Sequence, residues 1–276
     1  MMMRSLCNRL TQYSPSEARS VVRLLLMDTF GLTLTDICAG ALDALTAAQK
    51  EHLERLMVRL EQGEPVQYVT GKAVFCDRPF RVGQGCLIPR PETEELCQWV
   101  TEETEWHAAI LDIGTGSGCI AVTLKCNIPS ANVVAWDVST DALAIAQENA
   151  KLNQAEVVFV QEDILCPPED KEKWDVIVSN PPYICRREAA SMERNVLGYE
   201  PHLALFVPDD DPLLFYRNIV LYAVQALKPD GKLFFEINPL YVKEMRALFE
   251  KNGFKAVSVR HDMNGKARMM SGCLSE

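Results

Sequence analysis

The sequence lacks the features that mark membrane and secreted proteins. None of its 276 residues belongs to a stretch approaching the roughly 18 uncharged apolar residues that a membrane span needs. Residues 1–11 contain no long apolar segment of the kind found in secretion signals. We therefore expect a cytoplasmic protein that does not bind membranes.

Metal and disulfide patterns are absent as well. The ten cysteines are scattered singly, without a Cys-x-x-Cys pair or a histidine at metal-ligand spacing. The four histidines form no cluster with an acid or a nucleophile. We expect reduced, mostly buried thiols and no metal site.

Positive charge is scarce. The chain has 28 Lys and Arg residues against 38 Asp and Glu residues, a net charge of −10. Affinity for a phosphate backbone comes largely from clustered Lys and Arg. We therefore expect no stable complex with nucleic acid.

What is present indicates an α/β protein with a smaller helical domain. The 48% of apolar residues and the chain length suffice for two cores. We predict an N-terminal helical domain for substrate recognition over residues 1–65, with helices capped at Ser14 and Thr46. A linking β-hairpin follows over 66–88, where short β-branched runs alternate with Gly, Asp and Pro. Over 89–276, seven predicted strands alternate with helices, which indicates a mostly parallel sheet covered on both faces.

A glycine-rich loop follows the first predicted strand of this domain, residues 109–113. The sequence there is Asp112-Ile113-Gly114-Thr115-Gly116-Ser117-Gly118. Glycines let a backbone turn sharply and approach a ligand where a Cβ would clash. Asp137, at the end of the second strand, can accept both ribose hydroxyls of a nucleotide-type cofactor. Asp163, after the third strand, is a candidate partner for the adenine amine.

The glycine spacing favours S-adenosyl-L-methionine over NAD. The pattern is Gly-x-Gly-x-Gly, whereas the dinucleotide fingerprint is Gly-x-Gly-x-x-Gly. Asp112 would repel a pyrophosphate but suits the ammonium group of a methionine moiety. We therefore predict a Rossmann-like domain that binds S-adenosyl-L-methionine.

A second motif, Asn180-Pro181-Pro182-Tyr183, comes directly after the apolar strand 174–179. Open α/β sheets place their ligands at such strand ends. Two successive prolines lack N–H groups and hold the chain extended. The Asn180 amide oxygen and the Pro181 carbonyl could accept both N–H bonds of a planar –NH₂ group, with the Tyr183 ring over its face.

These two motifs together resemble methyltransferases that act on planar amino or amide nitrogen. Three further stretches, 63–71, 87–94 and 262–268, resemble the release factor glutamine methyltransferase family (PrmC/HemK type), and the most specific is Ile88-Pro89-Arg90-Pro91-Glu92-Thr93-Glu94. The resemblance runs from about residue 60 to the end. It implies a class I S-adenosylmethionine-dependent methyltransferase with a Rossmann-like fold. The implied reaction is N5-methylation of the glutamine in the Gly-Gly-Gln motif of class I peptide chain release factors, with S-adenosyl-L-homocysteine as the cofactor product. We expect the enzyme to be a monomer.

By position, the resemblance implies roles for individual residues. Asn180, Pro181, Pro182 and Tyr183 match the glutamine site, and Gly114 to Gly118, Asp137 and Asn180 match the cofactor contacts. Ile164 occupies a position near the adenine where some members have an aromatic residue. Asn238 occupies a position where the family more often has Gly. For Arg90, Glu92 and Glu94, a role in shaping the pocket and a plain solvated helix start remain open.

Other functions remain as alternatives. An adenine N6 or guanine N2 nucleic-acid methyltransferase would use the same tetrapeptide on a flipped base, although the acidic composition opposes it. A cofactor-binding adaptor without turnover is disfavoured by the intact Asn180 motif. An NAD-dependent oxidoreductase is disfavoured by the glycine spacing.

Overall fold

The computed structural model describes residues 3–275, apart from the side chain of Ser191, and it contains two compact units. The N-terminal unit runs to Lys72 and also includes Met192–Tyr199, and the α/β unit comprises the rest of the chain. The predicted bounds assign residues 192–199 to the α/β domain, because nothing in the sequence of these eight residues indicates that they belong to the helical unit. Among the described residues, no helix is long and apolar enough to cross a membrane.

The N-terminal unit is a small helical bundle. Both predicted capping boxes form, Ser14 with Glu17 and Thr46 with Gln49, and they begin its two long helices. The apolar faces of these helices meet in one buried cluster that includes Val22, Leu25 and Leu53. Its helices are α1 (Met3–Cys7), α2 (Pro15–Phe30), α3 (Leu34–Cys38), η1 (Ala41–Ala44), α4 (Ala47–Glu61), α5 (Val66–Thr70) and α9 (Arg194–Tyr199).

The linking segment differs in part from its prediction. Residues 66–70 form helix α5 rather than the first strand of a hairpin, because Val66 and Val69 pack into the N-terminal core and this packing overrides β-propensity. The hairpin itself is shorter than predicted, with β1 (Lys72–Phe75) and β2 (Arg78–Arg81). Cys76 and Asp77, both at positive φ, form its two-residue turn.

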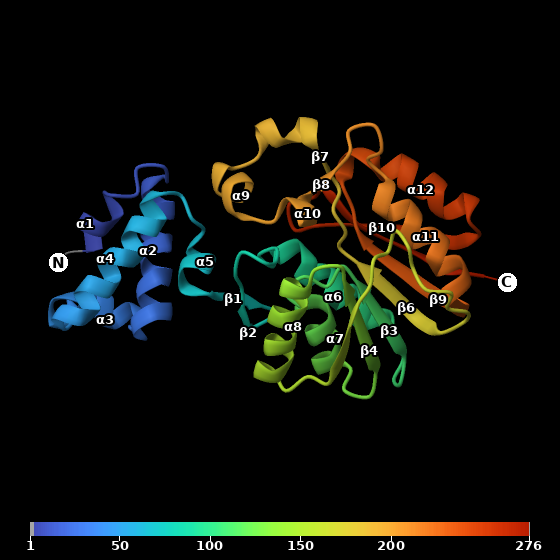
Figure 1. The fold of residues 1–276 in the computed structure, drawn as a ribbon, viewed down its shortest axis with the longest axis horizontal. Coiled ribbons are helices and arrows are strands. Elements are labelled where there is room, and N and C mark those ends of the chain that lie inside the picture. Colours follow the sequence, from blue (N-terminus) through green and yellow to red (C-terminus); the bar gives the residue numbers. More distant parts are fainter. Residues whose placement is uncertain (1–2, 276) are drawn as a thin grey trace. The chain divides into compact units, whose positions relative to one another are not determined.

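A seven-stranded sheet organises the α/β unit, as predicted (Figure 1). The strand order is β10-β11-β9-β6-β3-β4-β5, and only the pairs made by β11 are antiparallel. The chain runs outward from β3 in one direction to β4 and β5, and in the other to β6 and β9, which places a topological switch point between β3 and β6. The strands are β3 (Ala109–Ile113), β4 (Asn132–Asp137), β5 (Val157–Gln161), β6 (Trp174–Ser179), β9 (Leu227–Glu236), β10 (Phe254–His261) and β11 (Ala267–Leu274).

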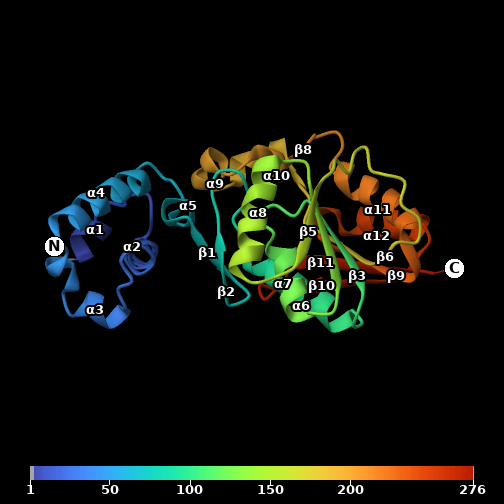
Figure 2. The ribbon, with the colours of Figure 1, turned by 60° about the horizontal axis from the view of Figure 1, so that its bottom comes forward.

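Helices cover both faces of this sheet (Figure 2). Along β3, Ile110 packs into the cluster on the side of α6 and α7, whereas Leu111 and Ile113 pack on the side of α11 and α12. Both faces are therefore apolar, as a parallel sheet requires. The helices are α6 (Pro91–Glu103), α7 (Cys119–Asn127), α8 (Thr140–Leu152), α11 (Leu214–Ala226) and α12 (Val242–Lys251), and the short elements are β7 (Ile184–Cys185), η2 (Arg186–Ser191), α10 (His202–Leu205), β8 (Phe206–Val207) and η3 (Pro239–Tyr241).

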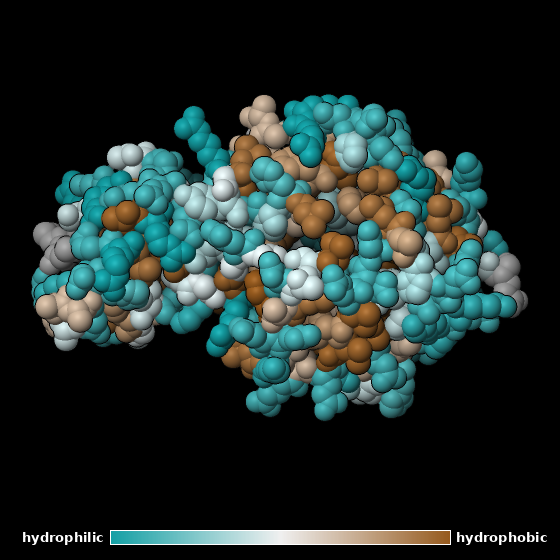
Figure 3. Space-filling model, in the orientation of Figure 1, coloured by the Kyte–Doolittle hydropathy of each residue, from teal (hydrophilic) through white to brown (hydrophobic). Residues whose placement is uncertain are grey.

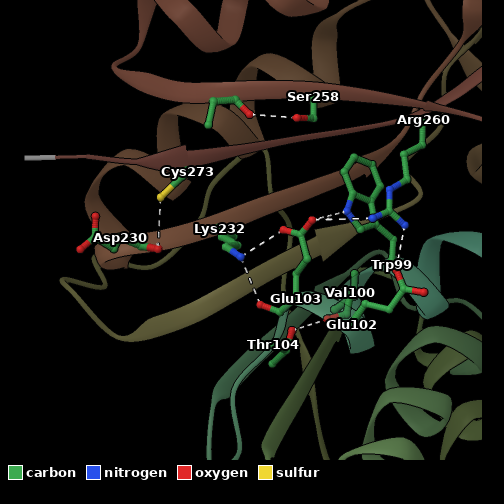
Figure 4. Close-up of polar contacts among 11 residues, drawn as sticks. Trp99, Val100, Glu102, Glu103, Thr104, Asp230, Lys232, Ser258, Arg260 and Cys273 are labelled. Atoms are coloured by element: carbon green, nitrogen blue, oxygen red, sulfur yellow. Dashed lines mark hydrogen bonds and ion pairs between the residues drawn. The ribbon is translucent and has the colours of Figure 1, made fainter.

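Polar contacts fix the C-terminal end of α6 to the sheet (Figure 4). The Trp99 indole N–H donates to Glu103 at 2.6 Å, and the Lys232 ammonium of β9 donates to the same carboxylate at 3.0 Å. The Arg260 guanidinium of β10 lies 4.4 Å from the centre of the Trp99 ring. These contacts hold one end of α6, and its other end reaches the site described below.

The cysteines only partly match their prediction. All ten are free thiols, but four are buried, four are half-buried, and Cys38 and Cys166 are exposed. Burial raises the pKa of the Cys86 thiol to about 11, so this thiol stays neutral at physiological pH.

Candidate active site

A cavity lies in the α/β unit at the carboxyl ends of β3, β4, β5 and β6. It encloses about 1120 Å³ of empty space, its open mouth included. Most of its wall is apolar, and a few polar groups converge on it, as in ligand pockets generally. Its lining includes the exposed side chains of Val138 and Leu203. Figure 3 shows brown, apolar surface on this unit among mostly teal residues.

The glycine loop forms one wall of the cavity. Gly114, Thr115, Gly116 and Ser117 line it, and the N–H groups of Gly114 and Thr115 both donate to the Trp136 carbonyl at 2.9 Å. Gly114 and Gly116 have positive φ angles, and a Cβ added at either position would meet no protein atom within 4 Å. The loop therefore presents bare backbone to open space.

Gly118 has a different role from the other loop glycines. It is absent from the residues that line the cavity, and it caps the start of α7 at a φ of +79°. A Cβ at this position would come 3.0 Å from the Ala146 Cβ of α8. We infer that Gly118 permits close packing of the loop against α8.

Asp112 is fully buried and is also absent from the cavity wall. Its Oδ2 accepts hydrogen bonds from the Thr115 hydroxyl at 2.6 Å and from the Ala121 N–H at 3.2 Å, whereas its buried Oδ1 has no hydrogen-bond partner. Burial raises the pKa of the Asp112 carboxyl to about 7. The carboxylate fastens the loop to α7 and keeps one oxygen unpaired.

The two further acidic residues predicted to contact a cofactor both line the cavity. Each carboxylate oxygen of Asp137 accepts a backbone N–H, from Gly116 at 2.8 Å and from Ser139 at 2.9 Å, and burial raises its pKa. Asp163 is exposed and accepts from the Leu165 N–H at 2.9 Å. Ile164 is buried beside it and supplies an apolar wall.

The Asn180 tetrapeptide contributes a second part of the cavity wall. Ser179 ends β6, and its hydroxyl donates to the Ile113 carbonyl of β3 at 2.6 Å, which ties the two motifs together. Asn180, Pro181 and Pro182 line the cavity, but Tyr183 does not. The Tyr183 hydroxyl donates instead to the buried carboxylate of Glu236 at 2.9 Å. The ring is therefore not part of the cavity wall in this structure.

Four residues that support the site were not singled out from the sequence. They are Thr93 and Glu236, which contact the tetrapeptide, and Asn149 and Glu200, which hold the neighbouring loops. The Asn149 amide donates to the Ser117 carbonyl at 2.8 Å. All four are polar side chains that are nearly or fully buried, and their burial could not be read from the sequence.

Of the three residues with open roles, Arg90 lines the cavity. Its guanidinium is paired with Glu200, whose second oxygen accepts the Ile88 N–H at 3.2 Å. Glu94 accepts the N–H of Cys76, in the turn between β1 and β2, at 3.1 Å, and it does not line the cavity. Glu92 is half-buried and is absent from the cavity wall.

Comparison with known proteins identifies the family. Two family models match the chain, the PrmC N-terminal domain over residues 2–71 and the methyltransferase small domain over residues 65–197. A Bacteroides thetaiotaomicron protein named release factor glutamine methyltransferase is 45% identical over 260 residues, which cover 94% of each chain. The chain belongs to the release factor glutamine methyltransferase family.

Further matches agree with this assignment. A Flavobacterium psychrophilum release factor glutamine methyltransferase is 46% identical over 222 residues, covering 79% of this chain and 78% of that protein. The crystal structure of a methyltransferase from Pyrococcus furiosus superposes with a TM-score of 0.54 at 16% identity, covering 84% of this chain and all of that one. The second match concerns the fold alone, and it confirms the predicted methyltransferase architecture.

Asn238, where we expected this family to have Gly more often, is accommodated without strain. Its φ of −72° does not require glycine. Its amide donates to the Tyr183 carbonyl at 3.1 Å, and its Oδ1 accepts the Leu240 N–H at 3.0 Å. The asparagine thus fastens the end of the tetrapeptide to η3.

Proposed function

We propose that this chain transfers a methyl group from S-adenosyl-L-methionine to the N5 amide nitrogen of the glutamine in the Gly-Gly-Gln motif of class I peptide chain release factors. The observation that supports this best is the position of Asn180. It lines the same cavity as the glycine loop, at the switch point between β3 and β6. An amide acceptor beside a nucleotide-type loop suits methylation of a planar nitrogen.

The cavity residues fit S-adenosyl-L-methionine. The unpaired, buried Oδ1 of Asp112 suits an ammonium group close to the loop, and Gly114 and Gly116 leave space that any Cβ would occupy. We assign Asp137 to the ribose hydroxyls, and Asp163 with Ile164 to the adenine. When bound, the cofactor supplies an electrophilic methyl group and leaves as S-adenosyl-L-homocysteine.

The chain's contribution to the reaction is to position a weak nucleophile. The lone pair of an amide nitrogen is delocalised into the carbonyl, the resonance that gives a peptide bond a rotation barrier of roughly 18–20 kcal/mol. We assign Asn180 Oδ1 and the Pro181 carbonyl as acceptors for the two N–H bonds of the substrate amide. These acceptors favour the positive charge that grows on the nitrogen, and the proton can leave to water afterwards. Orientation of this kind can lower a barrier by about 7–11 kcal/mol.

The first test is transfer of labelled methyl from S-adenosylmethionine to a purified class I release factor. A release factor with the Gly-Gly-Gln glutamine replaced is the matched control. Label on the first protein and none on the second supports the proposal. Label on bulk DNA or RNA, with none on the release factor, would favour a nucleic-acid methyltransferase instead.

A second test separates chemistry from cofactor binding. Asn180→Ala should lower kcat by about 10²–10³-fold, the usual effect of losing one preorganised hydrogen-bonding group. The affinity for S-adenosylhomocysteine, measured by calorimetry, should change little. A parallel collapse of cofactor binding and rate would show that Asn180 acts mainly on the cofactor.

None of the described residues of the N-terminal unit lines the cavity at the glycine loop, and we propose that this unit contacts the release factor. Deletion of residues 1–60 should impair transfer to the full-length factor more than transfer to a short Gly-Gly-Gln peptide. Equal loss on both substrates would contradict this role.

A further inference from the structure

A chain of buried polar contacts reaches Asn180 from behind the cavity wall. Glu236, the last residue of β9, is 2% exposed and accepts a hydrogen bond from the Thr93 hydroxyl at 2.6 Å. Thr93, on the first turn of α6, is also 2% exposed, and its Oγ1 lies 3.2 Å from the Asn180 side-chain nitrogen. Three elements, β9, α6 and the end of β6, thus meet at one asparagine.

The direction of these hydrogen bonds follows from the number of protons available. An ionised carboxylate can only accept, and Glu236 accepts from two hydroxyls, those of Thr93 and Tyr183. Burial raises the pKa of Glu236, and the hydrogen bonds from the two hydroxyls and the positive charge of Arg268 oppose this rise by favouring the ionised form. A hydroxyl has a single proton, so a Thr93 hydroxyl that donates to Glu236 can only accept from Asn180.

This arrangement decides which atom of the Asn180 amide lies beside Thr93. The atom beside Thr93 must be the donor Nδ2, and Oδ1 is then directed elsewhere. The reverse orientation would need the Thr93 proton for Asn180 Oδ1. Glu236 would then keep only the hydrogen bond from Tyr183 and lose the charge-assisted one from Thr93, which is stronger than a neutral hydrogen bond. The orientation of the Asn180 amide therefore follows from the hydrogen-bond network, and not only from the coordinates of Oδ1 and Nδ2, which are similar in size and easily exchanged.

We propose that Thr93 and Glu236 are positioning residues that hold the Asn180 side chain with Oδ1 presented to the substrate nitrogen. This inference rests on the proposed function, since it concerns an acceptor for an –NH₂ group. With the amide reversed, Nδ2 would face the N–H bonds of the substrate, donor against donor. Thr93 and Glu236 thus act on the reaction without touching the substrate.

Nuclear magnetic resonance tests the orientation without any activity measurement. In protein labelled with ¹⁵N-asparagine, the Asn180 side-chain signal is the one lost in Asn180→Ala. We expect slow solvent exchange of one of its Nδ2 protons in the wild type and in Thr93→Ser, and fast exchange in Thr93→Val. Unchanged exchange in Thr93→Val would overturn the proposal whatever the enzyme's substrate is.

Kinetics with matched variants test the consequence. Thr93→Val, which keeps the side-chain shape but removes the hydroxyl, should lower kcat about 10–100-fold with little change in the affinity for S-adenosylhomocysteine, and Thr93→Ser should restore most of the rate. The control is Thr101→Val on the same helix, where the hydroxyl donates to the Cys97 carbonyl of α6 at 2.8 Å and accepts from the Asn127 side-chain amide at 3.4 Å. Wild-type kcat in Thr93→Val, or failure of Ser to restore the rate, would contradict the proposal.

A double-mutant comparison distinguishes positioning from a general structural effect. If Thr93 acts through Asn180, Thr93→Val should cause no further loss of single-turnover rate in the Asn180→Ala background. Losses that multiply would indicate an independent structural role and overturn the proposal.

Glu236→Gln is the second variant, for use if Thr93→Val does not fold. A glutamine amide oxygen replaces only one of the two carboxylate acceptors, so the Asn180 orientation is no longer imposed. We expect faster Nδ2 exchange and a lower kcat, and wild-type values for both would overturn the proposal. If the wild-type protein methylates no glutamine but the exchange pattern is as expected, the proposed function fails while the orientation stands.

Discussion

Replacement of Asp112 by Asn tests how the buried carboxylate couples cofactor binding to pH. Burial raises the pKa of this carboxyl from 3.8 to about 7, a difference that corresponds to roughly 4 kcal/mol. The folded protein binds the proton more tightly than the unfolded chain. The contribution of the Asp112 carboxyl to the free energy of unfolding is therefore greatest below pH 3.8, falls as the pH rises towards 7, and is constant above pH 7.

The variant removes the charge but not the shape. Its amide oxygen can still accept from Thr115 and Ala121, whereas the new –NH₂ group takes the position of an oxygen that has no partner. An unsatisfied buried donor costs about 1–3 kcal/mol. At pH 8 the apo variant should thus be more stable than the wild type by roughly 1–3 kcal/mol, measured by urea unfolding.

Cofactor binding should respond in the opposite direction. An ammonium group near Oδ1 favours the ionised carboxylate, of which about a tenth is present at pH 6 and about nine tenths at pH 8. The wild type should therefore bind S-adenosylhomocysteine about tenfold more tightly at pH 8 than at pH 6, on the same Henderson–Hasselbalch basis. Asp112→Asn should bind more weakly and lose most of this dependence, and what remains belongs to Asp137, whose pKa burial also raises. Wild-type pH dependence in the variant would refute the reasoning.

Three further substitutions test the supporting structure. Gly118→Ala should destabilise the protein by about 1–2 kcal/mol or more, because it combines a left-handed backbone with a Cβ 3.0 Å from Ala146, and an unchanged urea midpoint would contradict this. Tyr183→Phe should keep its activity per folded molecule but lose about 1–3 kcal/mol of stability, since Glu236 loses a hydrogen bond; a large fall in kcat would show that the hydroxyl takes part in catalysis. Asn238→Gly should lower the free energy of unfolding by about 1 kcal/mol for each of the two hydrogen bonds that Asn238 loses, and with it the melting temperature. An unaltered melting curve would show that a glycine serves equally well at this position.

The sheet and its ligand-binding edge could be predicted because their signals are local. Strands 109–113 and 174–179 were predicted with the bounds that the structure gives to β3 and β6, since each is a short apolar run between clear turn signals. Their pairing followed from the rule that such motifs lie at the ends of neighbouring parallel strands. Helix α5 was missed because its five residues have β-branched character, and their helical form depends on packing with α2 and α4.

The support of the site could not be predicted, because it depends on residues far apart in the sequence. Thr93 and Asn180 are 87 positions apart, and Thr93 and Glu236 are 143 positions apart. Thr93 lies in the stretch 88–94 that resembles the family, but no local pattern at Thr93 or Glu236 predicts the burial of its side chain or its contact with the tetrapeptide. Asp112 was expected to face the cofactor, and its second function, fastening Thr115 and α7, depends on a fold around it that local spacing does not describe.

The N-terminal unit is assembled from two separate stretches of chain. Helix α9 belongs to it, and the Tyr199 hydroxyl donates to the Gln62 carbonyl at 3.0 Å. During synthesis this unit therefore cannot be completed until residue 199 has left the ribosome. By then four of the seven strands of the sheet, β3 to β6, have been translated, whereas β9, β10 and β11 have not. A fragment that ends at Lys72 lacks α9, so its folding would report on an incomplete unit. The N-terminal unit can therefore be completed only after much of the α/β unit has been synthesised.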